Sequence, residues 1–225
     1  MILLLGDSFA DRMDRQGAWC DILSDMLGED VENYGLASSS LSYSYNLFLK
    51  HYEPGKYSKV IFIATDRYRQ FYYQIKPDIQ TLSFQVDSDR SKQINYPKPL
   101  NSYHNKIFEG QELINVMYSN TYDWTEKAIR DSLNYRVKEP LLILDVMEQL
   151  VKIQKIDYDN LNIKSPLGLD AETDRRPNHL SMKQSYQLAE YIAKYFTENF
   201  DIHEIFNNPK DYFTVSKSKQ EAGLI

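Results

Sequence analysis

The sequence predicts a three-layer α/β/α sandwich with a mostly parallel, flavodoxin-like sheet. Two apolar runs, Met1–Leu5 and Val60–Ile63, are typical of parallel strands that are covered on both faces. An amphipathic helix is expected between them, at residues 16–27, closed by Gly28 as a C-cap. Its apolar stripe consists of Trp19, Ile22, Leu23, Met26 and Leu27. Alternation of strands and helices indicates βαβ units and therefore a parallel sheet.

The remaining elements continue this alternation. Strands are expected near residues 2–5, 31–34, 59–64 and 141–145, in the spatial order 2-1-3-4 of a doubly wound sheet. Ile156–Ile163 is a weaker candidate for a fifth strand. Helices are expected near residues 39–52, 123–137 and 146–155, and after Ser181. Asp123 with Glu126, and Ser181 with Gln184, have the spacing of capping boxes.

Residues 67–122 interrupt the pattern. The stretch is polar and contains seven tyrosines and three prolines. So long an irregular segment within one domain is usually functional or an inserted subdomain. It would leave the third strand at its carboxyl end, so we expect Tyr68, Tyr72 and Tyr73 to line a pocket there. We therefore expect one domain at residues 1–206 with this insert, and a loosely held tail at residues 207–225.

Composition narrows the class of protein. The 225 residues are 42% hydrophobic and carry a net charge of −6, with no long basic run, which argues against a nucleic-acid partner. The longest apolar run is too short to span a bilayer, and the N-terminus has no basic segment typical of a signal peptide. We expect a cytoplasmic protein. The single cysteine, Cys20, is expected to be a structural residue of the first helix.

The Gly6-Asp7-Ser8 sequence places a hydroxyl group where the first strand meets the first helix. Ligands bind at this end of open α/β sheets, and backbone N–H groups at such a turn can stabilise an oxyanion. A serine here is more often only a cap, and a lone histidine is more often a surface residue. Asp7 is expected to hydrogen-bond the turn.

Three blocks of this chain resemble the GDSL, or SGNH, hydrolase superfamily. They are the Gly6–Asp11 sequence, Gly35 after the second strand, and His179 before the final helix. The resemblance covers roughly residues 1–66 and 140–200. It implies that Ser8 is the nucleophile, that His179 is the base, and that the N–H groups of Ser8 and Gly35 form the oxyanion hole.

Two positions depart from the family pattern. The third block normally contains an asparagine that donates to the oxyanion, but this chain has Ala64 and Thr65 there, with Thr65 a weak substitute. The catalytic acid normally lies three residues before the histidine, where this chain has Arg176. Asp174, five residues before His179, is the first choice for the acid. A solvated loop carboxylate, with a Ser–His dyad held by a backbone carbonyl, is the alternative.

These features predict a serine esterase that cleaves a carboxylic ester through an acyl-enzyme. The 18 tyrosines suit a sugar-binding surface, which favours an acyl group on a carbohydrate as the substrate, although partly buried packing tyrosines are the commoner explanation. The main alternative is a catalytically degenerate binding or assembly protein with the same fold. A mononucleotide-binding protein is a weaker alternative, because the first turn has no phosphate-binding loop. No metal or cofactor is implied, and a homo-oligomer stays open.

Overall fold

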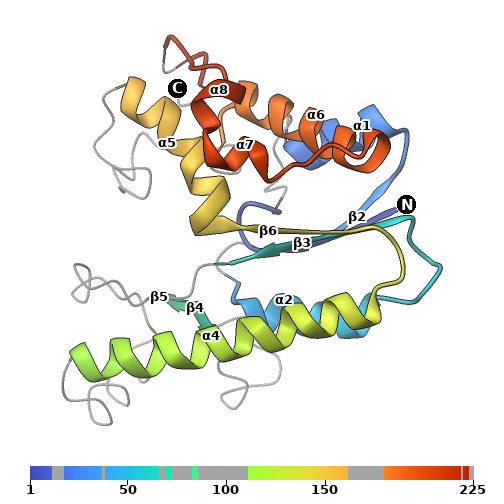
Figure 1. The fold of residues 1–225 in the computed structure, drawn as a ribbon, viewed down its shortest axis with the longest axis vertical. Coiled ribbons are helices and arrows are strands. Elements are labelled where there is room, and N and C mark those ends of the chain that lie inside the picture. Colours follow the sequence, from blue (N-terminus) through green and yellow to red (C-terminus); the bar gives the residue numbers. More distant parts are fainter. Residues whose placement is uncertain are drawn as a thin grey trace.

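Four parallel strands form the central sheet of the computed structural model (Figure 1). The strands pair in the order β2-β1-β3-β6, so the order predicted from the sequence is confirmed and β1 lies inside the sheet. Their bounds are β1 (Ile2–Gly6), β2 (Val31–Gly35), β3 (Lys59–Ala64) and β6 (Leu141–Asp145). The structure describes residues 1–11, 18–36, 39–65, 69–71, 83–85, 111–161, 180–218 and 220–222.

Helices cover both faces of the sheet, which confirms the three-layer α/β/α class (Figure 1). One face is covered by α1 (Trp19–Leu27), α5 (Val151–Asn160) and α6 (Met182–Glu198), together with the short helices α7 (Glu204–Asn207) and α8 (Pro209–Tyr212). The other face is covered by α2 (Leu41–His51) and α4 (Gln111–Arg136). A separate antiparallel pair joins β4 (Arg69–Phe71) and β5 (Ser83–Gln85).

The first strand is apolar at every position because both of its faces are buried. Ile2 and Leu4 enter the core shared with α1 and α6, whereas Leu3 and Leu5 enter the core shared with α2 and α4. All four side chains have no exposed surface. Each fully buried side chain of this size contributes about 1.5–3 kcal/mol, so β1 anchors the two layers to each other.

Two of the predicted helix caps, Gly28 and Ser181, are confirmed, and Ser40 is a further one. Gly28 ends α1 in the left-handed region, with φ of 62°. Ser181 and Gln184 form the reciprocal capping box at the start of α6. In α2, the Ser40 side chain accepts a hydrogen bond from the Tyr43 amide at 3.3 Å. These local signals fix where the helices begin and end relative to the sheet.

The start of α4 corrects two expectations. The helix begins at Gln111 and runs through Asp123, so Asp123 is an exposed residue inside the helix and not its N-cap. Residues 111–122 therefore form regular structure, as do the strands β4 and β5, within a stretch expected to be irregular. An aspartate with a glutamate three residues later is equally compatible with the solvent face of a helix interior, which explains the error.

The chain after β6 corrects a third expectation. A π-helical turn, η1 (Val146–Leu150), leads directly into α5. The helix expected near residues 146–155 is confirmed but extends to Asn160. The candidate fifth strand at 156–163 is wrong, because residues 156–160 belong to α5. Ile156 is buried in the core under this helix, so its apolar character reflects helix packing.

Part of the segment after residue 207 is bound to the rest of the fold. Phe213 is 2% exposed and Ser216 is fully buried. Ser216 donates its N–H to Asp157 Oδ1 at 2.6 Å and its hydroxyl to Asp157 Oδ2 at 2.9 Å. These contacts bind the C-terminal segment to α5, and the prediction of a loose tail is wrong for this part.

Two further expectations concern the tyrosine-lined pocket and the absence of a membrane span. Tyr68, Tyr72 and Tyr73 lie outside the described residues, so the proposed tyrosine-lined pocket stays a prediction. Across the part of the chain that the structure describes, no helix has the length and apolar character needed to cross a membrane.

Candidate active site at the carboxyl end of the sheet

Ser8 lies directly beyond the carboxyl end of β1, in the turn that leads toward α1. We call residues Asp7–Asp11 the Ser8 turn. The register places Gly6, the last residue of β1, beside Gly35 at the end of β2. Asp7 is fully buried and Ser8 is 5% exposed. The candidate nucleophile thus follows the end of β1, which lies beside the end of β2, at the side of the sheet where this fold class binds ligands.

Asp7 builds the turn around Ser8. Its Oδ1 accepts the Phe9 N–H at 3.0 Å, and its backbone carbonyl accepts the N–H groups of Ala10 and Asp11, each at 3.0 Å. These bonds close one helical turn around the serine. The sequence prediction that Asp7 hydrogen-bonds the turn is confirmed.

Thr65 reaches the same carboxyl group from the end of β3. Its hydroxyl donates to Asp7 Oδ2 at 2.7 Å, and the threonine is 1% exposed. A hydroxyl group has one proton to donate. The structure therefore directs the Thr65 proton to Asp7, a different role from the oxyanion donor expected from the sequence.

Gly35 lies against the backbone of the Ser8 turn. A Cβ atom at this position would be 2.4 Å from the Ala10 carbonyl carbon and 2.6 Å from the Asp11 nitrogen. Only glycine allows the two chain segments to approach so closely. The Gly35 N–H donates to the Asn33 side-chain oxygen at 2.7 Å.

Asn33 is a site residue that the sequence interpretation missed. Its side-chain nitrogen donates to the Ala10 carbonyl at 2.7 Å and lies 3.5 Å from Cys20 Sγ. The alternation of side chains along a strand could have identified this residue. Asn33 is two residues after the buried Val31, so the period of two places a polar side chain on a core-facing side of β2. Such a residue needs hydrogen-bond partners within the protein.

The first helix supplies a further contact with the Ser8 turn. Trp19, which is fully buried, donates its indole N–H to the Phe9 carbonyl at 2.7 Å. Cys20 has no exposed surface, in agreement with the structural role predicted for it. The turn is therefore held by Trp19 of α1, by Asn33 of β2 and by Thr65, the residue that follows β3.

His179 and Asp174 lie outside the described residues, so their distances to Ser8 stay predictions. The described chain resumes at Leu180, which is 1% exposed and belongs to the apolar core that also contains Phe9 and Ala10. Ser181 then caps α6, which packs beside α1 (Figure 1).

A charged cluster also lies at the carboxyl ends of the strands, where β6 ends. Asp145 pairs in register with Ala64, the residue before Thr65. It accepts the Glu148 N–H at 2.7 Å and lies 3.6 Å from the Arg130 guanidinium. Burial raises the pKa of Asp145, and the Glu148 N–H and Arg130 oppose that shift. The bond to Glu148 makes Asp145 the N-cap of η1.

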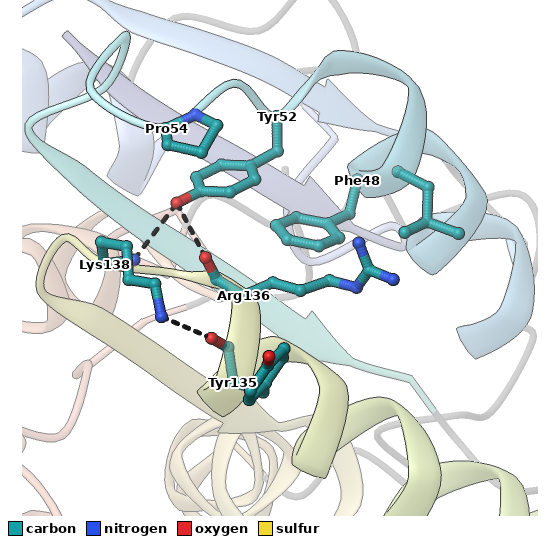
Figure 2. Close-up of a pocket in the computed structure, with 7 residues that line it drawn as sticks. Phe48, Tyr52, Pro54, Tyr135, Arg136 and Lys138 are labelled. Carbon is teal, nitrogen blue, oxygen red and sulfur yellow. Dashed lines mark hydrogen bonds between the residues drawn. The ribbon is translucent and has the colours of Figure 1, made fainter.

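An open groove at the opposite end of the strands, their amino end, is separate from the Ser8 turn. Figure 2 shows its walls near the ends of α2 and α4, with the Tyr52 hydroxyl bonded to the backbone of Lys138 and Arg136. Its volume is about 310 Å³. It is lined by Phe48, Leu49, Tyr52, Pro54, Tyr135, Arg136 and Lys138. Both helices end just before strands begin, so this groove lies at the amino ends of the strands.

Comparison with known proteins gives one structural similarity. No protein-family model matches the chain, and no curated protein matches it. Among solved structures, the chain is similar to a "putative lipolytic protein of G-D-S-L family" from Desulfitobacterium hafniense DCB-2. The sequences are 15% identical, the match covers 86% of this chain and 97% of the other, and the TM-score is 0.37.

Proposed function

We propose that the protein is a serine hydrolase that cleaves carboxylic esters with Ser8 as its nucleophile. The observation that carries the proposal is the construction of the Ser8 turn. An interior parallel strand delivers the serine to its carboxyl end. Trp19 and Asn33 hold the backbone of the turn, and Thr65 holds the side chain of Asp7. A fixed nucleophile saves the entropy of orienting it during the reaction.

The proposed reaction has two halves. Ser8 Oγ attacks the ester carbonyl while His179 takes the hydroxyl proton, and the proton then passes to the departing alcohol. Water next attacks the acyl-enzyme with His179 again as base, which releases the acid and restores Ser8. Asp174 would orient the imidazole of His179, and the backbone amides of Ser8 and Gly35 would receive the oxyanion.

The proposed substrate class is an acylated carbohydrate, with acetyl as the acyl group. The support is compositional: the chain has 18 tyrosines and only two tryptophans. A tyrosine presents an apolar ring and a hydroxyl group together, which suits the alternating apolar and polar faces of a sugar.

A nitrophenyl acetate assay with Ser8→Ala tests the proposal. Loss of the nucleophile should lower kcat by roughly 10³-fold or more, because only binding and oxyanion stabilisation remain. Ser24→Ala is the matched control, since the Ser24 hydroxyl donates to the Glu29 carbonyl at the opposite end of α1. Its rate should stay within about twofold of wild type. A fluorophosphonate should also label Ser8. Equal rates for wild type and Ser8→Ala, or labelling of another residue, would refute the proposal.

The alternative is a binding or assembly protein that retains the fold without the activity. Two contacts favour it: the Thr65 hydroxyl is bonded to Asp7, and the Gly35 N–H is bonded to Asn33. Both groups were expected to serve an oxyanion. An unlabelled Ser8 in a folded wild-type protein, with no ester hydrolysis, would support this alternative.

A further inference from the structure

The side-chain amide of Asn33 connects the end of β2 with the Ser8 turn. Its nitrogen donates to the Ala10 carbonyl and its oxygen accepts the Gly35 N–H, both at 2.7 Å. One side chain thus binds two backbone segments: Ala10 lies 23 residues before Asn33, and Gly35 lies two residues after it. Asn33 is only partly buried, so its position depends on these partners.

The orientation of this amide is fixed by the chemistry of its partners. A backbone carbonyl can only accept a hydrogen bond, and a backbone N–H can only donate one. Rotating the Asn33 amide by half a turn would place oxygen against the Ala10 carbonyl and N–H against the Gly35 N–H. Asparagine therefore fits both partners, whereas aspartate fits only Gly35.

We propose that Asn33 is a positioning residue for the hydrolysis reaction, and this inference rests on the proposed function. The two segments it binds carry the nucleophile, Ser8, and a proposed oxyanion donor, Gly35. Their spacing decides whether the oxyanion can meet the Gly35 N–H when Ser8 attacks. The Asn33 amide holds that spacing while no substrate is bound.

The same contact also satisfies the Gly35 N–H in the resting protein. An oxyanion carries a full negative charge, and charged acceptors form hydrogen bonds roughly twice as strong as neutral ones. The tetrahedral intermediate can therefore draw the Gly35 N–H away from the neutral Asn33 oxygen. The bond from Asn33 to Ala10 keeps the Ser8 turn in place during this exchange.

Asn33→Asp and Asn33→Leu test this inference together. Asn33→Asp has the same shape but repels the Ala10 carbonyl and binds the Gly35 N–H with a charged oxygen. Asn33→Leu removes both hydrogen bonds without adding charge. Each variant should lower kcat per labelled serine, Asn33→Asp by roughly tenfold to a hundredfold, since ~1 Å of misplacement costs about 10²-fold. KM should stay within about threefold, because misplacing the Gly35 N–H weakens its bond to the oxyanion, which forms only after the substrate has bound.

Gln187 provides a matched control. Its amide also accepts a backbone N–H, from Thr214 at 3.0 Å, and donates to a backbone carbonyl, that of Tyr212 at 3.1 Å. These bonds join α6 to the C-terminal segment and involve no residue of the Ser8 turn. Gln187→Glu and Gln187→Leu should lower Tm without changing kcat per labelled serine.

Fluorophosphonate titration counts the reactive serines in each sample, so kcat is compared per competent site and a smaller folded fraction does not affect it. The inference is overturned if Asn33→Leu keeps kcat per labelled serine within about twofold of wild type. A loss in Asn33→Asp alone would also overturn it, since it would reflect only the added charge. If wild type is neither labelled nor active, the proposed function fails, and the inference fails with it.

Discussion

The Thr65 hydroxyl donates a 2.7 Å hydrogen bond to Oδ2 of Asp7, which lies 58 residues earlier in the chain. Both residues are buried, and the other oxygen of Asp7 accepts the Phe9 N–H. One carboxyl group therefore joins the end of β3 to the turn that carries Ser8. Asp7, the residue next to the candidate nucleophile, thus has a structural role: it connects the ends of two neighbouring strands.

Thr65→Val should destabilise the protein by about 1.5–3 kcal/mol, the usual value of a buried hydrogen bond to a charged group. Valine keeps the shape of threonine but leaves Asp7 without this donor. Thr65→Ser keeps the hydroxyl and removes one methyl group, so its cost should be nearer ~0.8 kcal/mol. Urea unfolding measures both values. Equal stability of Thr65→Val and wild type would show that the bond contributes nothing.

Gly35→Ala should destabilise the fold by about 1–3 kcal/mol, because the added Cβ would meet backbone atoms that cannot rotate away. It should also slow fluorophosphonate labelling of Ser8, since Ala10 must move. Gly55→Ala is the control: its φ is 81°, but a Cβ there meets nothing within 4 Å. That variant should cost about 1–2 kcal/mol of backbone strain and leave labelling unchanged. Unchanged labelling in Gly35→Ala would contradict the close approach.

Glu32 should stabilise the fold in a pH-dependent way. Hydrogen bonds from Tyr34, Tyr57 and Lys56 lower the pKa of Glu32 to about 2 from its ordinary 4.5. A lowered pKa in the folded state favours folding above the ordinary value. The contribution is therefore complete above about pH 4.5 and is lost as the pH falls toward about 2.

The comparison with Glu32→Gln isolates this effect from other titrating groups. The difference in unfolding free energy between wild type and Glu32→Gln should be constant from pH 6 to 8 and should shrink as the pH falls from about 4.5 to 3. Urea unfolding at fixed ionic strength measures it. A difference that does not change with pH would contradict the assigned hydrogen bonds.

Ser216→Ala should destabilise the protein by about 1.5–3 kcal/mol, because it removes a buried hydroxyl that donates to Asp157. Ser218→Ala is a control two residues away: this serine is exposed and its hydroxyl accepts the Glu221 N–H at 3.0 Å, so its cost should be nearer ~0.5 kcal/mol, the low end for a hydrogen bond between neutral groups. A cooperative shift of the whole unfolding transition would show that the C-terminal segment unfolds with the domain. Similar values for the two variants would contradict the assigned anchor.

The strand order and most helix boundaries could be predicted because they depend on local patterns. A strand such as β1, with apolar side chains on both faces, indicates burial on both sides. The capping box of Ser181 and Gln184 can be recognised from four consecutive residues. Asp123 failed as a boundary signal because the same residues are acceptable on an exposed helix surface. The attachment of the polar segment after residue 207 could not be predicted, because Asp157 and Ser216 come into contact only in the folded chain.

The position of Ser8 at the end of β1 and the bonds of Asp7 within its turn could be predicted, but the contacts of Asn33 and Thr65 could not. The Gly6-Asp7-Ser8 sequence after an apolar run places the serine at the end of β1 without knowledge of any neighbour. The roles of Asn33 and Thr65 depend on the register between strands, which brings Gly35 beside Gly6 and Ala64 beside Asp145. Hydrogen bonds of this kind follow from tertiary geometry, and no single segment of the sequence encodes them.

The three side chains that hold the Ser8 turn have a consequence for the order of folding. Trp19, Asn33 and Thr65 reach the turn from 10, 23 and 58 residues away along the chain. Contacts over such separations form late, because each requires a loop to close first. The serine can therefore take its final geometry only once β2 and β3 flank β1. A nascent chain that has not yet completed β3 would lack the bond from Thr65 to Asp7, so the geometry of the Ser8 turn is complete only after the sheet has assembled.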